Sequence, residues 1–298
     1  MSLEPVAPVA SAAKGVADPT GLYLDLLKDI LVNNIYGRFE YQELLQASSS
    51  RKRALGRVLL WITKVYRLLW RDKSVGGEPL ISKSFDYDRR QRGNDWPSYA
   101  YTMVGRKRLD QLQQCLDIVE REHVPGDLVE TGIWRGGVCI FMAGYLKVHG
   151  VGDRTIWALD SFEGLPKPNA EAFPADKGDL HHTRRELRVG LESVQENFRT
   201  LGLLDQNVRF VKGFFSDTVP TLPVQKIAVL RLDGDMYEST MVVLKSLYAK
   251  VAPGGFVIVD DYALPNCQAA VHDFMRATGI DEKIETIGEY SAYWRKTR

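Results

Sequence analysis

The stretch that decides the fold reads I-A-V-L-R-L-D-G-D and runs from Ile227 to Asp235. Its apolar first part is too short for a helix and apolar on both faces, which is typical of a central strand buried on both sides. It ends in Asp233 and Asp235, which an extended strand would point to the same side. A second such stretch, G-F-V-I-V-D-D, covers residues 255–261. Ligands of open α/β sheets bind where strands end, so the two stretches predict one acidic pocket.

Strand and helix patterns alternate from Gly126 onward. We expect strands over 127–130, 155–160, 208–212, 227–235 and 255–260, helices over 136–149, 191–203, 239–250 and 268–278, and a closing antiparallel pair over 284–287 and 292–295. This order predicts right-handed crossovers and an α/β fold with a doubly wound, mostly parallel, Rossmann-like sheet of seven strands.

The residues before the sheet predict a tail and a helical extension. Residues 1–20 are rich in Ala, Pro and Val and are expected to be a disordered tail. Residues 21–98 are expected to form an N-terminal helical extension with a helix over 22–35, and the polar segment 74–98 to be a long loop that serves as a lid. The main domain then covers 99–298 and opens with a helix over 104–123.

Residues 51–73 form a basic amphipathic segment, R-K-R-A-L-G-R-V-L-L-W-I-T-K-V-Y-R-L-L-W-R-D-K. Basic helices that carry Trp and Leu lie in lipid interfaces, so membrane contact is one interpretation. A wide apolar face also suits packing on the main domain or on a second subunit, and we favour this interpretation. We therefore expect a homo-oligomer.

Composition excludes several classes of protein. The formal net charge is +1 over 298 residues, so no global field attracts nucleic acid. No apolar run is long enough to span a membrane, and the N-terminus lacks the pattern of a secretion signal. The three cysteines are far apart and odd in number, which argues against a disulfide framework and indicates a cytoplasmic location.

The first predicted strand runs into E-T-G-I-W-R-G-G, residues 130–137. The glycines allow a tight turn that brings the backbone close to a ligand at a helix start. The spacing is not that of the dinucleotide fingerprint, and Glu130 would repel a pyrophosphate, so a nicotinamide dehydrogenase is disfavoured. A carboxylate suits a cationic group such as a sulfonium.

The next two strands complete this cofactor prediction. Asp160 ends the second strand, where an acidic residue can accept both ribose hydroxyls. Gly213, Phe214 and Phe215 end the third strand and place aromatic side chains where an adenine ring could lie. Together with residues 130–137 they predict a pocket for S-adenosylmethionine.

The acidic pocket contains four aspartates, Asp233, Asp235, Asp260 and Asp261. Unpaired carboxylates this close repel one another and raise one another's pKa, which a hard divalent cation would relieve. Oxygen-only ligands without clustered His or Cys indicate Mg²⁺, with Mn²⁺ or Ca²⁺ as alternatives. Helix N-caps would explain single aspartates but not two pairs.

Several long motifs resemble the macrocin O-methyltransferase family. They cover residues 95–298 in order: D-W-P-S (95–98), G-D-L-V-E-T-G-I-W-R-G-G (126–137), A-L-D-S-F-E-G-L-P (158–166), G-L-L-D (202–205), L-R-L-D-G-D-M-Y-E-S-T (230–240) and G-G-F-V-I-V-D-D-Y (254–262). Members of this family are class I methyltransferases that use S-adenosylmethionine and magnesium to methylate sugar hydroxyls of macrolides and related natural products, so the resemblance implies a small-molecule glycoside as acceptor.

The resemblance also implies roles for single residues. It implies metal ligation by Asp233, Asp260 and Asp261, and it makes Asp235 or a neighbour the candidate base. It implies cofactor contacts at Thr102, Glu130, Thr131, Gly132, Asp160, Ser161 and Phe162.

The expected chemistry is magnesium-assisted deprotonation of the acceptor hydroxyl by Asp235 and attack on the sulfonium methyl group. His181 and His182 lie in the insertion after the second strand, and His181 is a further catalytic candidate, although a His pair in a loop is more often a surface feature. Two alternatives stay open: a catechol-type O-methyltransferase that acts on an aromatic diol, and a membrane-bound binding protein without turnover.

Overall fold

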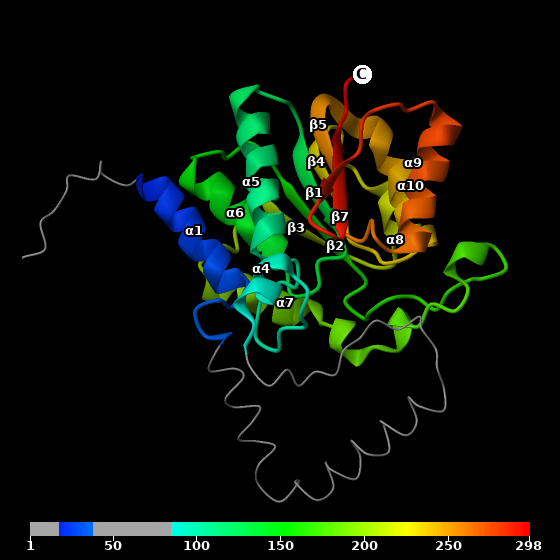
Figure 1. Ribbon diagram of the computed structural model, residues 1–298. Coiled ribbons are helices and arrows are strands. Elements are labelled where there is room, and N and C mark those ends of the chain that lie inside the picture. Colours follow the sequence, from blue (N-terminus) through cyan, green and yellow to red (C-terminus); the bar gives the residue numbers. More distant parts are fainter. Residues whose placement is uncertain (1–17, 38–84) are drawn as a thin grey trace, which may run out of the picture.

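Seven strands lie in one sheet within residues 18–37 and 85–298, the part of the chain that this computed structural model describes. The strands are β1 (Asp127–Thr131), β2 (Ile156–Asp160), β3 (Val208–Lys212), β4 (Ile227–Leu232), β5 (Val251–Val259), β6 (Glu285–Ile287) and β7 (Ser291–Arg295). Their order is β3-β2-β1-β4-β5-β7-β6 (Figure 1). β1 to β5 are parallel, and β7 is antiparallel to β5 and β6. The predicted doubly wound sheet and its closing antiparallel pair are confirmed.

Helices cover both faces of this sheet (Figure 1). One face packs against α5 (Gly105–Arg121), α6 (Gly137–Val148) and α7 (Leu191–Thr200), and the other against α9 (Tyr237–Leu247) and α10 (Pro265–Thr278) beside the short α8 (Phe215–Thr218). Leu128 of β1 lies in the first core and Val129 in the second. Neighbouring side chains of one strand therefore point into opposite cores, as the period of a strand requires.

β4 is the central strand that the opening stretch predicted. All six of its residues are buried, and it pairs in parallel with β1 and β5. Pairing continues just past the strand ends, because the Asp233 amide donates to the Thr131 carbonyl and the Asp260 amide to the Leu232 carbonyl. Parallel pairing of β4 with β5 therefore brings Asp233 and Asp260 to the same edge.

The expectation that the extended strand continues to Asp235 is wrong. β4 ends at Leu232, and Asp235 adopts a left-handed backbone with φ 57°. A side chain in this conformation no longer follows the alternation of a strand. Asp233 and Asp235 are therefore placed by a turn and not by a shared strand face.

The N-terminal helix is α1 (Pro19–Leu31), somewhat earlier than the predicted 22–35. Asp18 caps it by accepting hydrogen bonds from the amides of Thr20 and Gly21. Leu24, Leu27 and Leu31 are buried in the core that also contains α5 and α6. α1 therefore packs directly on the helices of the sheet.

The expected loop over 74–98 contains a short helix, α4 (Tyr87–Arg92), so this part of the prediction is wrong. The Asp86 side chain caps it at the Arg89 amide, and Gly93 ends it in the left-handed conformation with φ 68°. The sequence D-Y-D-R-R-Q-R-G carries both signals, which a search for apolar periodicity alone overlooks. Residues 74–84 lie outside the described part of the chain.

The disordered tail expected over 1–20 and the basic helix expected over 51–73 also fall largely or wholly outside the described residues. The division between the extension and a domain over 99–298 stays a prediction. Among the described helices, none combines the length and the apolar character that crossing a membrane requires. Cys115, Cys139 and Cys267 are free and buried.

Candidate active site

A pocket of about 400 Å³ opens at the carboxyl edge of the parallel strands. Its walls come from the turns after β1, β2, β3, β4 and β5, and from the segment 93–108 that leads into α5. This is the edge where open α/β sheets bind ligands.

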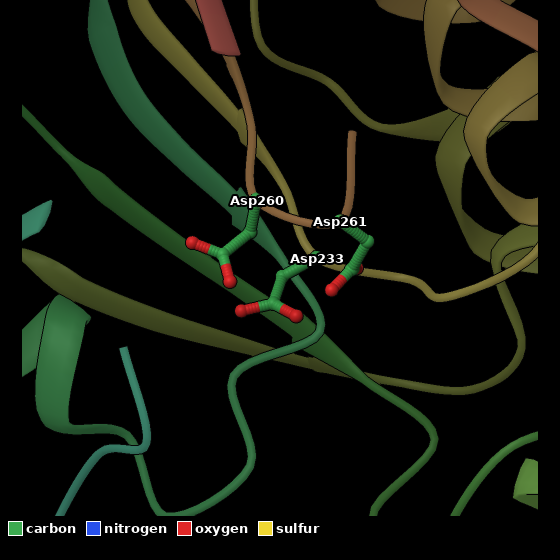
Figure 2. Close-up of side chains that lie close together, drawn as sticks. All are labelled: Asp233, Asp260 and Asp261. Atoms are coloured by element: carbon green, nitrogen blue, oxygen red, sulfur yellow. The ribbon is translucent and has the colours of Figure 1, made fainter. Parts of the chain in front are cut away.

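Asp233, Asp260 and Asp261 converge on the floor of this pocket (Figure 2). Each offers one carboxylate oxygen, and these three oxygens all lie within 4.8 Å of one another. Asp233 follows β4, and the other two follow β5, so the parallel pairing of these strands creates the cluster. Three such carboxylates fit a hard divalent cation.

Asp235 lies beside this cluster in the turn after β4. Its amide donates a hydrogen bond of 3.0 Å to Asp261 Oδ2, and its side chain lines the pocket. The turn at Gly234 is closely packed, because a Cβ there would lie 3.0 Å from the Ser239 Cβ.

Two carboxylates of the cluster, those of Asp233 and Asp261, favour protonation when no cation is present. Burial is the largest cause that raises the pKa of Asp233 well above its ordinary value, followed by repulsion from Asp260 and Asp261. Burial, followed by repulsion from Asp235 and Asp260, does the same to Asp261. A positive ion among these groups would reverse both effects, so the electrostatics and the donor atoms agree on a cation site.

Arg231 is the buried counter-charge of this edge. It lies on β4 with its side chain 3% exposed and donates to Glu130 Oε1 at 2.5 Å and to Asp233 Oδ2 at 2.9 Å. It also pairs with Asp260 Oδ1. Arg108 of α5 pairs with the other oxygen of Asp260. The guanidiniums of Arg231 and Arg108 thus face three carboxylates, those of Glu130, Asp233 and Asp260. The two positive charges hold these groups together but do not balance all of their negative charge.

Sequence reasoning missed both arginines, although Arg231 offered a signal. A charged residue inside an apolar, fully buried strand needs partners of opposite charge. The interpretation of Glu130 changes accordingly. Glu130 lines the pocket but is 1% exposed, and it already bonds to Arg231 and Cys139. Its carboxylate is therefore part of a buried ion-pair network, and its contact with a cationic group of the cofactor stays a prediction.

The turn after β1 brings its backbone close to the pocket. Gly132 has φ 86°, and a Cβ there would lie 1.6 Å from the Asp233 carbonyl oxygen. Only glycine fits this approach. Asp160, at the end of β2, accepts from the amides of Ile133 and Trp134 with Oδ2 and from the Phe162 amide with Oδ1. The Asp160 carboxylate therefore fixes both turns of the expected cofactor site.

The structure places most of the predicted cofactor residues at the pocket. Those that line it are Thr102, Glu130, Gly132, Asp160, Ser161 and Phe214. Thr131, Phe162 and Gly213 do not line it. The Thr131 side chain is buried and donates to the Arg231 carbonyl, and Phe162 is part of the apolar core. Trp134 and Phe215 add aromatic surface to the lining.

His181 also lines the pocket, on the side of the insertion after β2. The insertion contains three single-turn 3-10 helices, η1 (Pro174–Asp176), η2 (His181–Thr183) and η3 (Arg185–Leu187). His181 Nδ1 lies 2.7 Å from Asp179 Oδ2. The neighbouring His182 is not among the lining residues.

Comparison with known proteins shows the family of this chain. The family model of the macrocin O-methyltransferases (TylF) matches residues 20–296. This chain belongs to the macrocin O-methyltransferase family. It is therefore an O-methyltransferase that uses S-adenosylmethionine, and the predicted family membership and the predicted use of S-adenosylmethionine are confirmed.

Relatives of known name cover 78% or more of the chain. The 8-demethyl-8-(2,3-dimethoxy-alpha-L-rhamnosyl)-tetracenomycin-C 4'-O-methyltransferase of Streptomyces olivaceus is 44% identical over 281 residues, which are 94% of each chain. The mycinamicin III 3''-O-methyltransferase of Micromonospora griseorubida is 44% identical over 236 residues, which are 78% of this chain and 93% of that one. The solved structure of the O-methyltransferase NovP is 40% identical, has a TM-score of 0.77 and covers 94% of this chain and 100% of its own.

Proposed function

We propose that this family member methylates a sugar hydroxyl of a glycosylated natural product, with Mg²⁺ held by Asp233, Asp260 and Asp261 and with Asp235 as general base. The observation that carries the proposal is the convergence of three carboxylate oxygens within 4.8 Å beside the cofactor turn. The names of the two relatives support the acceptor class, since one acts on a rhamnosyl-tetracenomycin and the other on mycinamicin III.

The bound metal would supply Lewis-acid chemistry that lowers the pKa of an acceptor hydroxyl. The chain supplies the site for it. Arg231 and Arg108 hold the Asp260 carboxylate from two sides, and Arg231 also holds Asp233. Side chains fixed in this way need little reorganisation when a ligand arrives, which is the main requirement of an efficient polar site.

Asp235 suits the role of general base. Burial, followed by repulsion from Asp233, raises the pKa of Asp235 to about 7 in the metal-free protein, while His181 lowers it. A base is most effective when its pKa lies near the working pH, and burial, the largest cause, would still raise the pKa of Asp235 with a cation beside Asp233. Asp235 would accept the hydroxyl proton as the oxygen attacks the methyl group of S-adenosylmethionine.

The remaining lining residues would bind and orient the reactants. The Gly132 backbone and the Asp160 carboxylate shape the cofactor side of the pocket. Trp96, between α4 and α5, and Tyr290, directly before β7, also line the pocket. Holding the two reactants in line supplies a large part of the acceleration in bimolecular transfers.

The test measures methyl transfer from labelled S-adenosylmethionine to the rhamnosyl-tetracenomycin and mycinamicin III acceptors, with catechol as the alternative diol. We expect turnover of a glycoside with Mg²⁺ and a loss of about 10²-fold or more in kcat for Asp233→Asn and Asp235→Asn. The exposed Asp281→Asn is the control and should retain wild-type turnover.

Calorimetric titration with Mg²⁺ checks the metal separately from activity. Asp233→Asn should weaken binding, and Asp281→Asn should not. Undiminished turnover in a chelator would rule out the metal mechanism, and methylation of catechol in place of either glycoside would favour the catechol-type alternative.

A further inference from the structure

The backbone of Asp235 adopts a conformation that its surroundings must hold in place. Its φ of 57° lies in the left-handed region, which residues other than glycine adopt only uncommonly. Residues in this region persist where the neighbouring structure fixes them, and they cluster at active sites. Because the Asp235 side chain lines the pocket, the groups that fix its backbone also decide where this carboxylate lies.

Both backbone groups of Asp235 bond to side chains from other elements. Its amide donates to Asp261 Oδ2 at 3.0 Å, and its carbonyl accepts from Asn266 Nδ2 at 3.0 Å. Asp261 follows β5, and Asn266 lies in the first turn of α10. The turn after β4 is therefore held from outside by two residues that lie 26 and 31 positions further along the chain.

The side-chain amide of Asn266 is held in one orientation. Its Nδ2 donates both to the Asp235 carbonyl and to Asp176 Oδ1, each at 3.0 Å, and its Oδ1 accepts from the Cys267 amide at 3.0 Å. A backbone carbonyl can only accept and a backbone amide can only donate, so the reversed amide would lose these bonds. Asn266 thus joins the Asp235 turn to the insertion after β2, which carries Asp176.

Asp176 fixes the other side of this joint. It is 1% exposed, and its carboxylate accepts from the Tyr237 amide at 2.7 Å and from the Glu238 amide at 3.0 Å. The N-cap residue of α9 makes no side-chain cap of its own, so the cap of this helix comes from the insertion. The helix start that follows Asp235 is therefore fixed by the same carboxylate that binds Asn266.

We propose that Asn266 is a positioning residue for methyl transfer, which holds the Asp235 backbone so that the carboxylate keeps its place in the pocket, and that Asp176 holds Asn266. The inference rests on the proposed function of Asp235. It concerns the place of this carboxylate and not its ionisation, because the bond from Asn266 acts on the backbone. Asn266 is not among the residues that line the pocket, so it acts through Asp235.

The first experiment measures kcat and KM of Asn266→Ala with the glycoside that gives turnover. Without its partner the Asp235 carbonyl is free to turn, so kcat should fall by about tenfold or more, because displacing a catalytic group removes much of the acceleration. KM for S-adenosylmethionine should stay at the wild-type value. The matched control is Asn207→Ala, which removes an Asn bond to the Gly152 carbonyl directly before β3 and should retain wild-type kcat.

The variant Asn266→Asp separates hydrogen bonding from space filling. It has nearly the same shape, but its oxygens would face the Asp235 carbonyl and the Asp176 carboxylate without a hydrogen to donate. Its kcat should therefore fall at least as far as that of Asn266→Ala. Calorimetric titration with S-adenosylmethionine should give the wild-type affinity for both variants. A wild-type kcat in Asn266→Asp would mean that the side chain only fills space, and the inference would fail.

A double-mutant cycle tests whether Asn266 acts through Asp235. In the Asp235→Asn background the proposed base is already absent, so adding Asn266→Ala should reduce the residual kcat far less than it does in the wild type. An equal loss in both backgrounds would show that Asn266 acts independently of Asp235 and would overturn the positioning role. This comparison needs only variants that still bind S-adenosylmethionine.

The outcomes separate this inference from the proposed function. If Asn266→Ala retains wild-type kcat while Asp235→Asn loses it, the positioning role is wrong and the base assignment stands. If Asp235→Asn retains wild-type turnover, both fail. A loss of kcat in Asn266→Ala that largely disappears in the Asp235→Asn background supports the inference.

Discussion

The two sides of the pocket are built on different principles. The floor consists of strand ends after β4 and β5, where Asp233 and Asp260 are joined by the buried Arg231. The roof on the His181 side is the insertion after β2, which has only single-turn helices and mostly exposed or half-buried side chains. The floor is held by buried charges between paired strands, and the insertion by the Asp176 cap on α9.

This difference indicates a division of labour. Groups that must hold an ion and a reacting oxygen need side chains locked by packing and by second hydrogen bonds. Groups that contact a variable acceptor can lie on a loop that a rigid scaffold positions. Substitutions on the floor should therefore affect folding and chemistry together, whereas substitutions in the insertion should affect acceptor binding with a smaller effect on stability.

The largest effect should come from Arg231→Met. It leaves Glu130 and Asp260 buried beside each other without their shared counter-charge, so we expect a loss of about 3–5 kcal/mol in the free energy of unfolding, measured with denaturant. Arg209→Met on β3, where the side chain is exposed, is the control and should change stability by no more than about 0.5 kcal/mol. Equal stability of the two variants would show that the floor is not held by Arg231.

A smaller effect is expected for Asp176→Ala. Loss of the cap should cost about 1–2 kcal/mol, and release of the insertion should raise KM for the acceptor. Asp18→Ala removes a similar side-chain cap from α1, away from the pocket, and is the matched control. It should reduce stability without altering acceptor KM. A KM that changes equally in both variants would mean that the cap does not position the insertion.

The smallest effect concerns the dependence of stability on pH. The raised pKa of His181 stabilises the fold below the ordinary value of 6.5, and this stabilisation is lost as pH rises through the raised value. The lowered pKa of Asp179 stabilises the fold above its ordinary value of 3.8 and is lost on acidification. The His181–Asp179 pair should therefore stabilise the fold most between pH 3.8 and pH 6.5, by no more than about 1 kcal/mol.

Denaturant unfolding of the wild type and of Asp179→Asn at about pH 5.5 and about pH 8.5 checks this window. The difference between the two proteins should be larger at the lower pH. Asp281→Asn should show the same difference from the wild type at both values. A larger difference at the higher pH would contradict the pairing of protonated His181 with ionised Asp179.

The sequence by itself determined the sheet and the meeting of the aspartates. β3 has the predicted bounds, 208–212, because its apolar alternation is local information. The cluster of Asp233, Asp260 and Asp261 was also predictable, because parallel strands must end at one edge. Local periodicity and the rules of strand connection suffice for both results.

Only the tertiary structure decided which side chains pair with the clustered aspartates and how the insertion after β2 is fastened beside them. The partners of Arg231 lie on β1 and directly after β4 and β5, and no pattern within β4 specifies them. Likewise, the Asp176 cap joins residues that lie about sixty positions from it in the chain. Ion pairs and caps depend on side chains meeting across elements after folding, whereas strand periodicity is fixed by neighbours in the chain.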